Sequence, residues 1–119
     1  MDDLERVTAI VDGDLAETER RADALAWYGP DWYEREHERG CSWREIGDGA
    51  LAHLNEQRAE YRSTRIAAYA GDAEAQGLLH RNGINSTYLM AVDWYAGWQR
   101  YQRSARGRAA IAADKEARP

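Results

Sequence analysis

Hydrophobic positions recur every three or four residues over most of this chain, which is the spacing of an amphipathic helix. The first run follows Asp2 and Glu5, whose spacing resembles a capping box, and it predicts a helix over about residues 3–27. Its apolar positions are Leu4, Val7, Val11, Leu15, Ala22 and Leu25. Gly29 and Pro30 end this helix, because proline lacks a backbone N–H and disfavours helix in the residue before it.

The same spacing predicts four further helices, over about residues 31–39, 43–70, 73–81 and 86–106. Gly40 separates the first two of these, and Ser42 with Glu45 then forms a capping box. Gly71 and Gly83 mark later breaks. We therefore predict an all-α protein, a compact bundle of about five helices. Residues 1–106 form a single domain, and the Ala-rich charged segment 107–119 is expected to fray.

Composition supports this fold class. The chain of 119 residues has 21 alanines against 12 Val, Ile and Thr residues and no phenylalanine, a balance that favours helix over sheet. Its length allows one domain. No apolar run is long enough to cross a membrane, and the acidic start does not resemble a signal peptide, so we expect a soluble, cytoplasmic protein. Cys41, the single cysteine, excludes an internal disulfide.

The last predicted helix has apolar residues on both faces between positions 88 and 101. Such a helix is buried at the centre of a bundle or is covered by a partner. We expect Trp94, Trp98 and Tyr101 to form a partner interface, with burial inside the bundle as the alternative.

Charge is distributed unevenly along the sequence. Residues 1–57 carry six arginines and 15 acids, net −9, whereas residues 58–119 carry ten basic residues and six acids, net +4, which together give −5. Two arginine stripes at helical spacing lie in the second half. We predict that they contact a nucleic-acid backbone: Arg58, Arg62, Arg65, Arg100, Arg103 and Arg106. The alternative is that they pair with the acidic first half.

Candidate catalytic residues are few. Glu34 and His37 have the E-x-x-H spacing of half a di-iron site, but a second such pair is missing. Cys41 lies four residues after His37, and Gly40 breaks the helix between them. We therefore predict no enzyme, no metal, no cofactor and no small-molecule substrate.

The segment LLHRNGINSTYLMAVDWYAG, residues 78–97, resembles a segment of the small helical subunit of type III CRISPR effector complexes, the Cmr-type small-subunit family. The matching positions are Leu79, Asn82, Gly83, Ile84, Thr87, Tyr88 and Met90. The Leu-Pro that precedes this segment in the family is replaced here by Ala75 and Gln76. The resemblance implies a non-catalytic subunit that stacks along a guide–target duplex.

The sequence thus predicts a non-catalytic interaction subunit of an oligomer or larger assembly, with nucleic acid as an expected partner and no contact with membranes. One alternative is a helix-turn-helix DNA-binding regulator, in which Ser86, Thr87 and Tyr88 face the DNA groove. Another is a phage or virion assembly adaptor that contacts no nucleic acid.

Overall fold

The computed structural model describes residues 2–24, 28–81 and 83–116, and all regular secondary structure in these ranges is helical. The elements are α1 (Asp3–Arg20), a 3₁₀ helix η1 (Arg21–Ala24), α2 (Pro30–Glu38), α3 (Trp43–Tyr69), α4 (Ala73–His80), α5 (Gly83–Arg103) and α6 (Ala105–Glu116). The predicted all-α class is confirmed, and six α-helices replace the expected five.

The helix ends follow the local signals in the sequence. The Asp2 side chain accepts from the Glu5 N–H at 2.7 Å, and Ser42 and Glu45 form the predicted capping box before α3. Pro30 is the first residue of α2. Gly40 and Gly71 follow α2 and α3 with φ of 112° and 98°, a conformation that other residues rarely adopt. These two glycines therefore end their helices as predicted.

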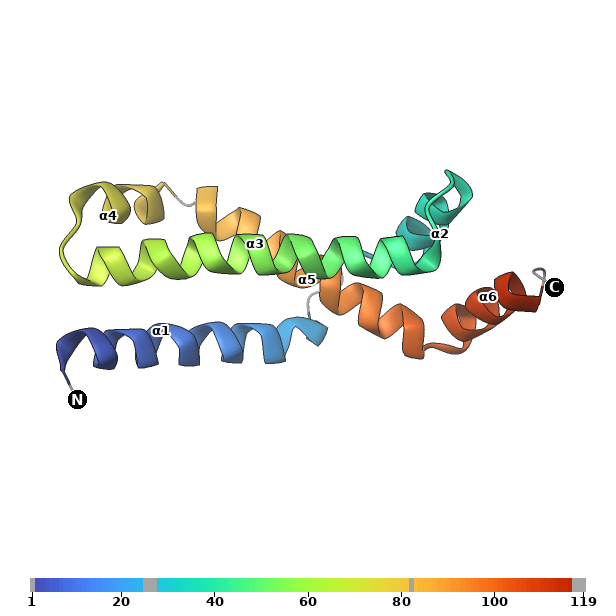
Figure 1. Ribbon diagram of the computed structural model, residues 1–119, viewed down its shortest axis with the longest axis horizontal. Coiled ribbons are helices and arrows are strands. Elements are labelled where there is room, and N and C mark those ends of the chain that lie inside the picture. The colour runs from blue at the N-terminus through green and yellow to red at the C-terminus, as the bar shows by residue number, and fades with distance from the viewer. Residues whose placement is uncertain (1, 25–27, 82, 117–119) are drawn as a thin grey trace.

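The molecule is an elongated bundle with principal extents of 57 × 27 × 25 Å. Its length comes from α3, whose 27 residues span about 40 Å. Figure 1 shows α1 running beside the half of α3 that ends at Tyr69, with α5 crossing behind α3. At the other end of the molecule α2 and α6 lie on either side of the start of α3, so the two termini are at opposite ends.

Three predicted boundaries differ in the structure. The first α-helix ends at Arg20, and the last predicted helix begins at Gly83 and is divided at Ser104. The segment expected to fray is helical through Glu116, because the Ser104 hydroxyl accepts from the Gly107 N–H at 3.0 Å and so caps a new helix. Parts of three predictions, at residues 25–27, 82 and 117–119, lie outside the described residues.

The buried side chains form two clusters that meet along α5. The first lies between α1, α3 and α5 and contains Val11, Leu15, Leu54, Tyr88 and Val92 among others. The second lies at the α2 and α6 end and is mostly aromatic: Tyr33, Trp43, Ile46, Trp98 and Tyr101. Tyr95 packs against both clusters. We call the second the aromatic cluster.

Three glycines allow the helices around the aromatic cluster to approach closely. A Cβ atom at Gly97 would overlap the Tyr33 hydroxyl, and one at Gly107 would overlap the Tyr101 carbonyl oxygen. A Cβ at Gly47 would lie 2.6 Å from Trp98 Nε1. Any side chain at these positions therefore forces α2, α3 or α6 away from α5.

Replacing Gly97 with alanine is expected to destabilise the protein by about 1–3 kcal/mol, because the added methyl group displaces the fully buried Tyr33. Gly13 in α1 is the matched control, since a Cβ there meets no other side chain within 4 Å. Gly13→Ala should stabilise the chain by about 0.5–1 kcal/mol. Urea unfolding of both variants measures the difference, and equal stabilities would contradict the close packing of α5.

Candidate functional site

The arginine stripe on α3 is directed at the acidic helix α1. Arg58 pairs with Glu19 at 2.5 Å, Arg62 with Asp12 at 2.6 Å and Arg65 with Asp14 at 2.8 Å. The Arg58 and Arg62 contacts are both bidentate. These three arginines therefore hold two helices of the same chain together, which is the alternative left open by the charge pattern. Their contact with nucleic acid stays a prediction.

We call the contact between α1 and α3 formed by these ion pairs the α1–α3 seam. Within it, Glu19 also contacts a third helix. It also accepts a hydrogen bond from the hydroxyl of Tyr88, a buried residue of α5, at 2.7 Å. Burial opposes ionisation of Glu19, but the hydrogen bonds from Arg58 and Tyr88 outweigh it, so the pKa of this carboxyl lies below its ordinary value. Burial and the bond to Glu19 raise the pKa of Tyr88. One carboxylate thus ties α1, α3 and α5 together.

The second arginine stripe consists of Arg100, Arg103 and Arg106, and each of these side chains lies in a different environment. Arg106 pairs with Asp31 at 2.8 Å and also with Glu34, both on α2. Arg100 is half-buried and donates to the Ala22 carbonyl oxygen at 3.4 Å. Arg103 is exposed to solvent. The six predicted arginines therefore do not form one continuous basic face.

Most of the predicted partner face, formed by Trp94, Trp98 and Tyr101, is covered by other helices of the same chain. Trp98 and Tyr101 are only 5% and 2% exposed, because α2, α3 and α6 cover them within the same chain. Trp94 is partly buried and packs against the same cluster. These side chains belong mainly to the core of the bundle, so they do not form an exposed face, and a partner contact through them stays a prediction.

The helix-turn-helix alternative meets a similar obstacle. Tyr88 is 1% exposed and bonded to Glu19, so it does not face a DNA groove, whereas Ser86 and Thr87 are exposed. The regulator alternative stays a prediction.

The residues considered for catalysis make structural contacts. Glu34 accepts from the Tyr101 hydroxyl at 2.9 Å in addition to its pairing with Arg106. His37 stacks on Trp43, and its Nε2 lies 3.3 Å from Asp114 Oδ1. The carbonyl oxygen of Cys41 lies 2.8 Å from His37 Nδ1. Within the described ranges, no three His, Cys, Asp or Glu side chains are grouped so as to hold a metal ion.

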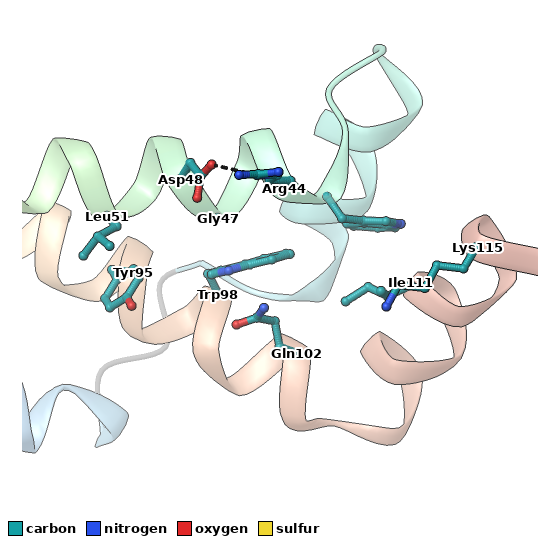
Figure 2. Close-up of a pocket in the computed structure, with 10 residues that line it drawn as sticks. Arg44, Gly47, Asp48, Leu51, Tyr95, Trp98, Gln102, Ile111 and Lys115 are labelled. Atoms are coloured by element: carbon teal, nitrogen blue, oxygen red, sulfur yellow. Dashed lines mark ion pairs between the residues drawn. The ribbon is translucent and has the colours of Figure 1, made fainter. Parts of the chain in front are cut away.

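A groove of about 400 Å³ lies between α3, α5 and α6 beside the aromatic cluster (Figure 2). We call it the aromatic groove. Its apolar lining residues are Trp43, Leu51, Tyr95, Trp98 and Ile111. Its polar lining residues are Arg44, Asp48, Gln102 and Lys115, and Arg44 pairs with Asp48 at 3.6 Å. Figure 2 shows Leu51, Tyr95 and Trp98 on one side of the groove and Ile111 with Lys115 across from them on α6.

The hydrophobic pattern of the sequence does not by itself predict this groove. Position 51 follows position 47 by one helical turn, which places Leu51 on the same face of α3 as Gly47. That spacing indicates an apolar position beside a site of close helix packing. The α6 wall is not predictable in the same way, because the Ala-rich charged composition of residues 107–119 predicts fraying.

Comparisons with known proteins give no relative of this chain: no protein-family model, curated protein or solved structure matches it. None of the helices in the described ranges has the length and apolar character needed to cross a bilayer. The resemblance of residues 78–97 to CRISPR small subunits stays a prediction.

Replacing Glu19 with glutamine is expected to destabilise the protein by about 1–3 kcal/mol at pH 7, because it removes the ionised partner of Arg58. The folded-state pKa of Glu19 is lowered, so its contribution is complete above about pH 4.5 and is lost as the pH falls through the folded-state pKa. The stability of Glu19→Gln should therefore depend less on pH in this window. Urea unfolding between pH 7 and pH 3 tests this, with the exposed Glu60→Gln as control.

Proposed function

We propose that this protein is a non-catalytic helical interaction subunit of a larger assembly, and that the aromatic groove binds a helical segment of a partner protein. The observation that carries this proposal is a groove walled by three helices, with Leu51 38% exposed at its edge. The partly exposed Leu51 and the aromatic rings beside it form a contiguous apolar surface, which is typical of an interaction site.

The composition of the groove supports a protein partner. Its floor is aromatic and aliphatic, and its rim carries the Arg44–Asp48 pair, Gln102 and Lys115. Protein interfaces have this arrangement, in which an apolar centre gives affinity and a polar rim fixes orientation. Leu51 on α3 and Tyr95 on α5 leave a hollow between two helices, into which apolar residues of a third helix fit at spacings of three and four.

Nucleic-acid binding has less support from the contacts of the arginines than protein binding has from the aromatic groove. Arg58, Arg62 and Arg65 each pair with a carboxylate of α1, which reduces the positive charge they offer to a phosphate backbone. An assembly subunit that contacts only proteins therefore fits the contacts better than the nucleic-acid form. A role as the small subunit of an RNA-guided complex remains a prediction from the sequence.

A photo-crosslinking amino acid at position 102 tests the proposal in the cells that make the protein. We expect a discrete protein adduct from Gln102, at the groove, and none from a crosslinker at Glu60, which is exposed on another face of α3. Leu51→Gln in the Gln102 crosslinking variant should reduce the adduct by about tenfold, since one such apolar contact is worth on the order of 1–2 kcal/mol.

Equal labelling from positions 102 and 60, or an adduct that survives Leu51→Gln unchanged, would show that the groove does not bind a partner. Because Leu51 is partly exposed, Leu51→Gln should leave the urea unfolding midpoint close to that of the wild type.

A further inference from the structure

A second apolar groove lies at the opposite end of the molecule, where α1 begins and α3 ends. It has a volume of about 420 Å³ and is lined by Asp3, Leu4, Val7, Ile66, Tyr69 and Ala70. Leu4 is 62% exposed and Tyr69 54% exposed, the two most exposed large apolar side chains among those described. We call this the end groove. It shares no lining residue with the aromatic groove.

The end groove is open because two helices extend beyond the third. The Asp14–Arg65, Asp12–Arg62 and Glu19–Arg58 pairs set α1 antiparallel to α3, so the first turns of α1 lie against the last turns of α3. Figure 1 shows α5 beginning some way short of this end. Val11 and Leu15 are buried where α5 is present, whereas Leu4, on the same face of α1, is left in solvent.

The segments at this end of the molecule carry most of the net negative charge of the chain, and Asp3 lines the groove itself. Residues 2–7 and 66–76 contain five carboxylates and one arginine, net −4 of the total −5, so all other residues together carry −1. The carboxylates are Asp2, Asp3, Glu5, Asp72 and Glu74, and the arginine is Arg6. The nearest arginine of α3, Arg65, is paired with Asp14 and lies over the ring of Tyr69.

We propose that the end groove binds an amphipathic helix of a partner protein that carries lysine or arginine beside its apolar face. The exposed Leu4 and Tyr69 accept apolar side chains at spacings of three and four. The carboxylate of Asp3 in the groove, with Asp2 and Glu5 beside it at the start of α1, attracts the basic residues. A second copy docked through the same end would bring two acidic ends together, each with segments of net −4, which charge repulsion opposes. The same charge disfavours an anionic membrane.

This inference goes beyond the aromatic groove and makes the subunit bivalent. With one groove at each end of a 57 Å bundle, the chain holds two partners apart at a fixed distance. Each groove is tested by its own variants, so the failure of one proposal leaves the other standing.

Two synthetic 18-residue helical peptides test the proposal. They share leucines at helical spacing, and one carries arginines beside this face where the other carries glutamates. Anisotropy titrations with the full chain should give a Kd on the order of 10 μM for the basic peptide and at least about tenfold weaker binding for the acidic one. Asp3→Asn should weaken binding of the basic peptide and reduce its salt dependence.

Matched variants locate the binding site. Leu4→Gln and Tyr69→Gln should each weaken the basic peptide by about tenfold, whereas Leu51→Gln, in the aromatic groove, should change its Kd by less than about twofold. Circular dichroism and urea unfolding identify any variant that fails to fold, and the other variant at this end then gives the result.

Three outcomes would overturn the proposal. One is equal affinity for the two peptides, and another is binding that Leu51→Gln removes and Leu4→Gln does not. The third is a doubled mass by light scattering that Leu4→Gln returns to the monomer, because the end groove would then be occupied by a second copy.

Discussion

The close packing of α5 against its neighbours is the constraint on which the rest of this structure depends. α5 contributes to both buried clusters, and Tyr95 packs against each of them. Asp93 on this helix is fully buried and accepts from the Tyr28 N–H at 3.1 Å, while Gly97 leaves room for Tyr33. Tyr28, just before α2, is therefore held on α5 by the buried carboxylate of Asp93, and the lack of a side chain at Gly97 lets Tyr33 pack there.

A core without phenylalanine must satisfy the polar atoms of its tyrosines and tryptophans. The hydroxyl of Tyr33 donates to the Trp94 carbonyl oxygen at 2.7 Å, and Tyr88 and Tyr101 donate to Glu19 and Glu34. The indole nitrogens of Trp43 and Trp94 are buried without a partner among the described residues, at a cost of about 1–3 kcal/mol each. Stacking of Trp43 on His37, with ring centroids 3.9 Å apart, offsets part of that cost.

Local sequence signals are sufficient where a glycine break or a complete capping box marks the end of a helix. Gly40, Gly71 and the Ser42 capping box all act within a few residues of the helix end, and their boundaries were predicted. The cap formed by Ser104 acts at the same range but carries a weaker signal, because glycine rather than Glu or Gln follows three residues later and no capping box is present.

Long-range contacts are only partly predictable from the same patterns, because the uneven charge indicates pairing with the acidic first half as an alternative but does not identify the partners. The spacing of Arg58, Arg62 and Arg65 showed that they share a face of α3, but spacing does not show which helix lies opposite. Their acidic partners lie 39 to 51 residues earlier in the chain. The same is true of the two grooves, since each needs helices that are distant in sequence.

The use of arginine instead of lysine at the helix contacts has a consequence for the chemistry of the surface. Among the ion pairs described above that have a permanently charged basic partner, those that join α1 to α3 and α2 to α6 all use an arginine. The chain has one lysine, Lys115, and it lies on the α6 wall of the aromatic groove. Acylation of lysine side chains therefore leaves the α1–α3 seam charged and intact. The only lysine it neutralises lies at the mouth of that groove.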